Sequence, residues 1–347
     1  MSMADEVRKP QHSKTTVKKK KSFSEAFIPH KNDSPKEIAS KIFSLFSMLV
    51  LIVCCVILGV YFYQQFEAKQ NNANIKVIYN QAQKENISDD ASADGNTAET
   101  PDGVEVIRKP LVNTPAADEM LAINKDYVGY IYIPDVLSEA VVQTTDNEYY
   151  LNHNFYDQKR SCGTVFADYR DNVNDYSDLQ SDNIILYGHN QRDGTMFGNL
   201  DYYKWDYKYW LKNPFIYFDN CYESSTYVII SSFVTNTEPE HDNGNVFAYN
   251  NFIDFRDSGD YTYANFIDEV QKRSHFITGI DVNENDKFLT LSTCSYEWDP
   301  SRHVIIARKL RDGETTDNID TTNFTVNSNP KWPAVYYKYN GGSYIEQ

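Results

Sequence analysis

The sequence predicts a mostly β fold with inserted helices: an eight-stranded barrel, closed or nearly closed, preceded by one transmembrane helix. Eight short runs rich in β-branched and aromatic residues follow one another between residues 128 and 310, and such a series is typical of a barrel. Ahead of them, residues 42–63 form an uncharged and almost wholly apolar stretch. As a helix, its 22 residues span roughly 33 Å, enough to cross the hydrocarbon core of a bilayer.

The flanks of this apolar stretch predict its orientation. Residues 1–41 contain ten lysines and arginines against five acidic residues, and positive flanks stay on the cytoplasmic side. We therefore expect a basic cytoplasmic tail (1–41), a single-pass signal anchor (42–63) in the cell membrane, and an extracellular remainder. A cleaved signal peptide is the weaker alternative, because the stretch is longer than a usual signal core and no small-residue cleavage site follows it.

Charge narrows the range of partners. The formal net charge is −16, and removing the +5 of residues 1–41 (ten positive minus five negative) leaves −21 for the rest of the chain. An external part this acidic is poorly suited to bind nucleic acid. We therefore expect no nucleic-acid partner.

The region between the anchor and the barrel, residues 64–113, predicts a stalk followed by a linker. Residues 64–86 are polar with scattered apolar positions, a pattern that favours an extracellular helical stalk. Residues 87–104 hold almost no large apolar side chains, and such a segment cannot bury enough surface to offset the entropy of ordering. We expect a flexible acidic linker here and a globular domain over residues 114–310.

The globular domain is expected to open with a helix and to continue with strands. Thr114 and Pro115 suit the N-cap and the first position of a helix that reaches Ile123. Short helices are expected at 146–152 and 195–203. The expected strands cover residues 128–133, 140–143, 163–167, 183–187, 215–219, 226–235, 287–293 and 303–310.

A longer helix is expected at residues 261–275, where apolar residues recur at spacings of three and four. It either forms one wall of a substrate groove or covers one face of the barrel, since both positions produce the same apolar stripe. Residues 311–347 are polar, with an aromatic run from Trp332 to Tyr339. We interpret them as a C-terminal extension, without a predicted structure.

Five cysteines are present. Cys54 and Cys55 lie in the apolar stretch, whereas Cys162, Cys221 and Cys294 fall in the external part. An odd number of external cysteines leaves at least one free thiol. Cys162 and Cys221 are interpreted as small buried residues, with a disulfide between them as the alternative.

Cys294 is the candidate nucleophile. It ends one strand-like run, and Arg302 stands just before the next. The two runs predict a hairpin that brings Cys294 beside Arg302 at one rim of a sheet. A guanidinium beside a thiol favours the thiolate and can hold an anion.

Three other charged residues of this hairpin are not expected to be catalytic. Arg308 shares a face with Arg302, but it lies near the far end of the strand. Glu297 and Asp299, in the loop, are expected to be solvated.

His189 is the candidate proton-transfer partner, since a thiol nucleophile usually needs a base or an ion-pair partner. It follows the apolar run at 183–187 through Gly188, which suits a turn at the strand end and close backbone approach. This position places the imidazole at the rim of the barrel. Contact between His189 and Cys294 does not follow from their spacing.

These residues resemble those of the sortases, which are membrane-anchored cysteine transpeptidases of Gram-positive bacteria. The resemblance covers roughly residues 115–310 and rests on three features: Tyr187-Gly188-His189-Asn190, Thr290-Leu291-Ser292-Thr293-Cys294, and Arg302. Four segments resemble the class B sortases in particular: residues 124–134, 146–153 and 163–170, and the helix at 261–275. The tail after Leu310 is longer than the family needs.

The resemblance implies a sortase-type barrel and a covalent mechanism. Cys294 would attack the backbone carbonyl after threonine in the C-terminal sorting signal of a surface protein. Arg302, with the backbone N–H of Ser295 as a second donor, would hold the tetrahedral oxyanion. His189 would protonate the leaving amine and then deprotonate the incoming one. The thioester would pass to a peptidoglycan amine of the cell wall, and neither a metal nor an organic cofactor is implied.

Two other functions stay open at this point. An L,D-transpeptidase of peptidoglycan also uses an external cysteine and histidine, although its cysteine typically stands in a Ser-His-Gly-Cys context, which this sequence lacks. A catalytically inactive sortase-like barrel would serve as a surface binding module, and its Cys294 would be unreactive.

Overall fold

The computed structural model describes residues 24, 27–87 and 110–342. The chain falls into two compact units, Met1–Gln64 and Gln65–Gln347. Most of the predicted cytoplasmic tail and acidic linker lies outside the described residues, as do the last five residues of the chain.

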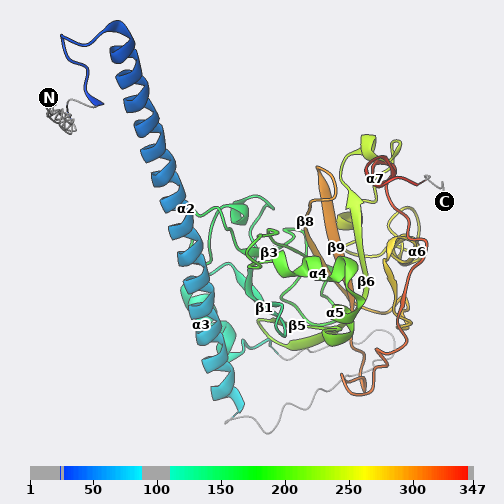
Figure 1. The fold of residues 1–347 in the computed structure, drawn as a ribbon. Coiled ribbons are helices and arrows are strands. Elements are labelled where there is room, and N and C mark those ends of the chain that lie inside the picture. Colours follow the sequence, from blue (N-terminus) through cyan, green and yellow to red (C-terminus); the bar gives the residue numbers. More distant parts are fainter. Residues whose placement is uncertain (1–23, 25–26, 88–109, 343–347) are drawn as a thin grey trace, which may run out of the picture. The chain divides into compact units, whose positions relative to one another are not determined.

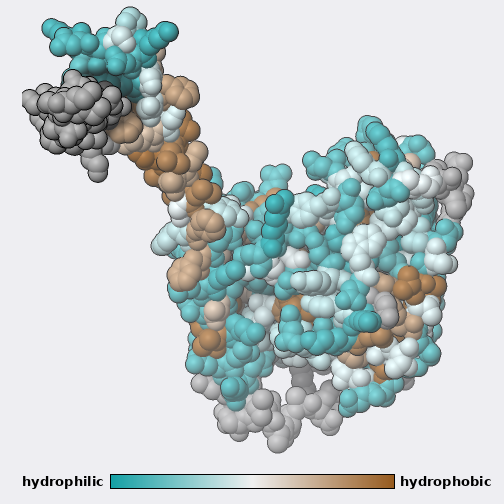
Figure 2. Space-filling model, viewed as in Figure 1, coloured by the Kyte–Doolittle hydropathy of each residue, from teal (hydrophilic) through white to brown (hydrophobic). Residues whose placement is uncertain are grey.

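The first unit holds the start of helix α2 (Pro35–Ile87). A capping box opens the helix: the Glu37 carboxylate accepts from the Ser34 N–H at 2.9 Å, and the Ser34 hydroxyl accepts from the Glu37 N–H at 3.4 Å. The large apolar side chains of residues 42–63 are exposed, and Figure 2 shows them as the brown stretch of this helix. Within the described part of the chain, α2 is the one helix long and apolar enough to span a membrane.

The part of α2 from Gln65 onward belongs to the second unit. Ile75 and Tyr79 are buried in one cluster with Met120. The Tyr79 ring stacks on Tyr130 with 3.8 Å between the ring centroids. The helical conformation predicted for residues 64–86 is therefore present, but this segment packs into the globular unit and is not a separate stalk.

The second unit is built on a closed eight-stranded barrel (Figure 1). Its strand order is β1-β2-β3-β4-β8-β9-β6-β5, and β5 pairs back to β1. The pairs β2–β3 and β4–β8 are parallel, and the others are antiparallel. The bounds are β1 Tyr127–Ile133, β2 Leu137–Val142, β3 Val165–Ala167, β4 Asn183–Tyr187, β5 Phe215–Asn220, β6 Ser224–Asn236, β8 Phe288–Ser295 and β9 Ser301–Lys309. All eight predicted strands are confirmed, with ends shifted by a few residues.

One small sheet was not predicted. It pairs β7 (Phe276–Ile277) with β10 (Thr325–Val326), and β10 belongs to the C-terminal extension. Two residues are too few for a recognisable alternation of apolar and polar positions. The extension, which had no predicted structure, therefore contributes a strand to the globular unit.

Short helices occupy several of the connections. The helix α3 (Pro115–Ile123) has the predicted cap, in which the Thr114 hydroxyl accepts from the Ala117 N–H at 3.1 Å. The helices predicted at 146–152 and 195–203 correspond to η1 and to η2 with α4. The bounds are η1 Tyr149–Leu151, η2 Gly198–Asp201, α4 Tyr202–Trp205, α5 Tyr207–Lys212, η3 Pro239–Asp242, η4 Tyr249–Asn251 and α7 Ala334–Asn340.

Helix α6 (Tyr263–Arg273) covers one face of the barrel. Its buried Phe266 and Val270 lie in one cluster with Val304 and Ile306 of β9. The residue between those two on β9, Ile305, belongs to the cluster inside the barrel, because successive side chains of a strand point to opposite faces. Of the two positions predicted for this helix, covering the barrel is the one found.

The two cysteines expected to be structural are both free thiols. Cys221 is buried, and this burial raises the pKa of its thiol to about 11. Cys162 is only partly buried, and desolvation likewise raises its pKa. The disulfide alternative is wrong, and the interpretation as a buried residue is confirmed for Cys221.

Replacing Ile75 with alanine tests whether α2 stabilises the barrel. Ile75 is 3% exposed, whereas Val77 on the same helix is 53% exposed. We expect Ile75→Ala to lower the free energy of unfolding by about 2–5 kcal/mol and Val77→Ala to change it by about 0.5 kcal/mol or less. Urea denaturation followed by near-UV circular dichroism measures both. Equal stabilities would contradict the packing of this helix on the barrel.

Candidate active site

Strand β8 places Cys294 beside Arg302. In the antiparallel register of β8 with β9, these two residues lie directly opposite each other. Side chains of such a pair share one face of the sheet, with Cβ atoms about 5 Å apart. The predicted hairpin, with the thiol and the guanidinium at one rim, is therefore confirmed.

The parallel pairing of β4 with β8 brings His189 to the level of Cys294. In this register Tyr187 lies opposite Ser292, and His189 and Cys294 each stand two residues further along the same direction. The pairing continues past the end of β4, because the Gly188 N–H donates to the Ser292 carbonyl at 3.3 Å. The strand of Cys294 thus lies between β4, which leads to His189, and β9, which carries Arg302.

His189, Cys294 and Arg302 line one groove with a volume of about 580 Å³. Cys294 is exposed, and the other two side chains are half-buried. Residues 246–250, before α6, form one wall of the groove, and residues of the β2–β3 connection form the other. One of the two positions predicted for helix 261–275 was a wall of the substrate groove. That wall is formed by the segment that precedes the helix.

The two arginines of β9 have different partners. The Arg302 guanidinium donates to the Ser301 carbonyl at 3.0 Å, and no ion pair engages it within the part of the chain that the structure describes. Arg308 is 1% exposed and lies at the other end of the hairpin. Its guanidinium donates to both carboxylate oxygens of Glu314, at 2.6 and 3.0 Å. Of the two arginines of β9, Arg302 is thus the one that lines the groove and has no carboxylate partner among the described residues.

The Leu151 carbonyl orients the His189 ring, with 2.9 Å between the carbonyl oxygen and Nε2. A carbonyl oxygen only accepts hydrogen bonds, so Nε2 carries the hydrogen and Nδ1 is the nitrogen free to gain or lose a proton. Gly163 backs the ring. A Cβ at position 163 would lie 3.2 Å from His189 Cδ2, and the φ of +65° there also favours glycine.

An ion pair between the buried Asp168 and the exposed Arg170 holds one wall of the groove. Arg170 donates to both carboxylate oxygens of Asp168, each at 2.8 Å, and also to the Asn250 carbonyl at 2.7 Å. The Tyr187 hydroxyl donates to the same carboxylate at 3.0 Å. Burial alone raises the pKa of Asp168, but the hydrogen bonds from Arg170 and Tyr187 outweigh it and keep that pKa below its ordinary value. The wall, the end of β3 and the floor of the groove are held together by this ionised carboxylate.

A polar network beneath Cys294 was missed by the sequence analysis. Asn190 donates to the Cys294 carbonyl and to Asp201, at 2.9 Å each. Asp201 pairs with Lys204 at 3.0 Å, and Lys204 Nζ lies 2.8 Å from Glu297. Lys204 is only 4% exposed. A lysine just beyond the short helix expected at 195–203 carries no signal of burial, which is why the network was not found.

The environment of the loop after Cys294 differs in part from the prediction. Glu297, expected to be solvated, is half-buried. Burial raises its pKa, but hydrogen bonds from Lys204 and Ser295 lower it below the ordinary value. The Ser295 hydroxyl is held by Glu297 and lies 3.2 Å from Lys204 Nζ, so its side chain belongs to this network. Asp299 is exposed, as predicted.

Replacing Lys204 with methionine tests the network. The change leaves two carboxylates without their shared cation, and we expect the free energy of unfolding to fall by about 3–5 kcal/mol. Lys212→Met is the matched control, because Lys212 and its partner Asp135 are 64% and 77% exposed and such a pair is worth about 0–1 kcal/mol. Chemical denaturation measures both variants. A loss at position 204 no larger than at position 212 would contradict the role of the network.

Comparisons with known proteins agree with this geometry. Residues 131–310 match the sortase domain family model. The chain is 30% identical to Sortase B of Listeria monocytogenes over 204 residues, which are 57% of this chain and 76% of the relative. The structure of a Staphylococcus aureus sortase B–substrate complex is similar with a TM-score of 0.55 and 27% identity, covering 71% of this chain and 99% of that one.

A sortase B structure complexed with triglycine is similar with a TM-score of 0.54 and 28% identity, covering 70% of this chain and 99% of that one. The family model covers more than half of the chain, and both the curated relative and the solved structures are class B enzymes. This protein therefore belongs to the sortase family, is most like the class B sortases, and is a transpeptidase.

Proposed function

We propose that this enzyme is a membrane-anchored sortase that cleaves the C-terminal sorting signal of surface proteins after threonine and joins them to a cell-wall amine. The observation that carries the proposal is the placement of Cys294 between the strand of His189 and the strand of Arg302, at the floor of one groove. The family assignment does not favour the L,D-transpeptidase alternative.

Cys294 is the nucleophile in this proposal. As a thiolate, paired with the imidazolium of His189, it attacks the carbonyl carbon after threonine, and the carbonyl oxygen becomes an oxyanion. The guanidinium of Arg302 and the backbone N–H of Ser295 stabilise this charge, which develops only as the bond forms. Arg302 suits this task because no carboxylate among the described residues already neutralises it.

His189 moves the protons. The hydrogen bond from Nε2 to the Leu151 carbonyl sets the tautomer, so Nδ1 exchanges the proton with the reacting groups. The imidazolium donates a proton to the leaving amine as the peptide bond breaks, and a thioester to Cys294 remains. The neutral ring then accepts a proton from the incoming amine as it attacks that thioester.

The substrates and the cellular location of the enzyme are part of the same proposal. One similar sortase B is a substrate complex and another is complexed with triglycine, which supports a peptide donor and an amine acceptor for this chain. The apolar start of α2 supports a membrane anchor. The excess of positive residues before it supports a cytoplasmic N-terminus and an extracellular catalytic domain. The acceptor is then a peptidoglycan amine outside the cell.

Cys294→Ala tests the nucleophile. We expect complete loss of cleavage of fluorescence-quenched peptides that carry a sorting signal with threonine before the scissile bond, because no thioester forms. Cys162→Ala, at a partly buried thiol outside the groove, is the control and should cleave at the wild-type rate. Circular dichroism checks that both variants fold. Activity that survives in Cys294→Ala would sink the proposal, and an inactive wild type with an unreactive Cys294 would favour the binding-module alternative.

Arg302→Lys tests the oxyanion role. Lysine keeps the charge but not the planar pair of donors, so we expect kcat to fall by about 10²–10³-fold, with a smaller change in KM. Steady-state kinetics with the same peptides measure both constants. A kcat within threefold of the wild type would show that Arg302 does not stabilise the transition state.

A further inference from the structure

The C-terminal extension, of which the structure describes residues 311–342, takes no part in the proposed chemistry. The sortase family model ends at residue 310, yet parts of the extension pack on the barrel unit. Its β10 pairs with β7, and the N–H of Ala334 donates to the buried carboxylate of Asp242 at 2.8 Å. These contacts place it beside α6 and the end of β6.

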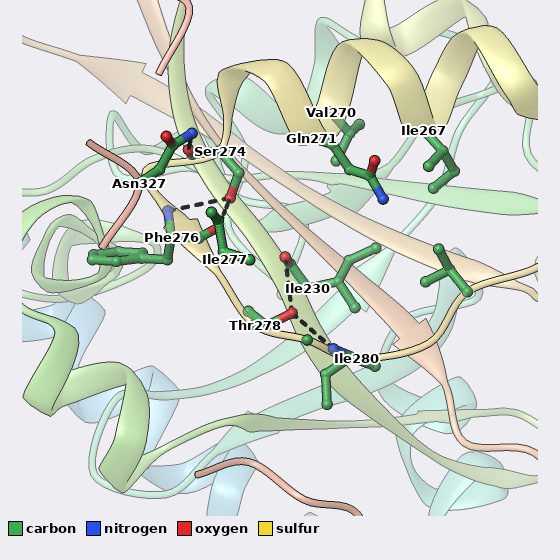
Figure 3. Close-up of a pocket in the computed structure, with 12 residues that line it drawn as sticks. Ile230, Ile267, Val270, Gln271, Ser274, Phe276, Ile277, Thr278, Ile280 and Asn327 are labelled. Atoms are coloured by element: carbon green, nitrogen blue, oxygen red, sulfur yellow. Dashed lines mark hydrogen bonds between the residues drawn. The ribbon is translucent and has the colours of Figure 1, made fainter. Parts of the chain in front are cut away.

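Asn327 attaches the extension to the segment that follows α6. Its backbone N–H donates to the His275 carbonyl at 2.9 Å, and its side chain donates to the Ser274 carbonyl at 2.8 Å. Figure 3 shows Asn327 beside Ser274 at the edge of a second pocket, of about 390 Å³, which shares no lining residue with the groove of Cys294. This pocket therefore does not connect the extension to the active site. The connection follows another route.

That route is an aromatic stack centred on Trp332. The Trp332 ring stacks on Tyr336 with 3.9 Å between centroids and on His275 with 4.5 Å, and it faces Trp205 at 5.7 Å. His275 is buried and uncharged near neutrality, because desolvation lowers its pKa to about 4. The stack thus holds two residues of the extension against two residues of the barrel unit.

One side of the stack contacts the loop between the nucleophile and the arginine. Trp298 lies in that loop, is 5% exposed, and shares a hydrophobic cluster with Trp332. Tyr336 meets the Trp298 ring edge to face, with 6.5 Å between centroids. The Ser301 hydroxyl lies 2.6 Å from the Trp298 carbonyl and 2.9 Å from the Ser295 carbonyl, which ties the loop to the ends of both strands.

The other side of the stack supports the polar network beneath Cys294. Trp205 directly follows Lys204, and the Lys204 carbonyl accepts from Nδ1 of His275 at 3.0 Å. The Lys204 ammonium in turn holds Ser295 and Glu297, at 3.2 and 2.8 Å. The stack therefore contacts the hairpin loop directly and also contacts the backbone of the lysine that holds it from below.

We propose that Trp332 and Tyr336 of the C-terminal extension are positioning residues for the active-site hairpin. They hold the loop that joins the strand of Cys294 to the strand of Arg302, so that the thiol and the guanidinium keep their register. The inference rests on the roles proposed above for Cys294 and Arg302. It concerns the geometry of the loop, because neither aromatic residue lines the groove.

The extension offers a matched control in Phe324. This residue stacks on Trp210 at 4.5 Å and lies tilted against Phe276 at 5.0 Å between ring centroids, so it attaches the same extension to the barrel unit without belonging to the hairpin loop cluster. Phe324→Ala therefore reports the general effect of loosening the extension. A difference between Phe324→Ala and Trp332→Ala reports the effect on the hairpin.

The test uses the full-length protein in detergent, with Trp332→Ala, Tyr336→Ala, Trp332→Phe and Phe324→Ala. Three quantities are measured: the melting temperature, kcat and KM on the sorting peptides, and the rate of alkylation of Cys294 by iodoacetamide from pH 5 to 9. Mass spectrometry of the peptide containing Cys294 separates its alkylation from that of the other thiols. Tyr336→Ala removes only the outer ring of the stack. It tests the same inference if Trp332→Ala does not fold.

We expect both Trp332→Ala and Phe324→Ala to lower the melting temperature. Only Trp332→Ala and Tyr336→Ala should lower kcat, by about 10- to 100-fold, with KM within about threefold. In these two variants Cys294 should also be alkylated more slowly, because the guanidinium no longer faces the thiol. Trp332→Phe should restore kcat to within about threefold, since a ring still fills the stack.

Two results would overturn the inference. Trp332→Ala and Tyr336→Ala with wild-type kcat and a wild-type alkylation profile would show that the stack does not position the hairpin. A loss of kcat in Phe324→Ala as large as in Trp332→Ala would show a general effect of the extension. A wild type that cleaves no sorting peptide, while the alkylation profiles still differ between variants, would fail the proposed function and leave the positioning role standing.

Discussion

The register of β8 between β4 and β9 is the constraint on which the site depends. Parallel pairing on one side sets His189 level with Cys294, and antiparallel pairing on the other side sets Arg302 opposite it. A slip of one residue in either pairing would turn side chains to the other face. This register is held because the strands are buried on both faces, with Leu291 and Ile305 inside the barrel and Phe288 under α6.

Charged groups stabilise the ends of these strands where apolar packing stops. Asp168 and Arg170 hold the groove wall, and Lys204 with its two carboxylates holds the hairpin beneath Cys294. The two buried charges among them, Asp168 and Lys204, each have a partner of opposite sign, which low-dielectric surroundings require. The aromatic stack around Trp332 adds an apolar support on the outer side of the hairpin. The exposed thiol is thus surrounded by residues whose positions are held by several independent contacts.

Some features were not predictable because their patterns are not local. The two-residue strands β7 and β10 are too short to show a period. The partly apolar spacing in residues 64–86 predicts a helix, but not whether it stands free or packs on a barrel. Here Ile75 and Tyr79 find a complementary surface next to Met120 and Tyr130. Lys204 lies in a short aromatic helix, and only the fold makes it a buried cation.

The sequence by itself determined the eight strands, the apolar helix, the Cys294–Arg302 hairpin and the resemblance to class B sortases. These rest on alternation, on the uncharged stretch at 42–63 and on short-range pairing across one loop. Only the tertiary structure decided that His189 stands level with Cys294, that residues 246–250 form the groove wall, and that the extension contacts the hairpin loop. Each of these depends on which strands pair and which surfaces meet, and no local period of the chain records such contacts.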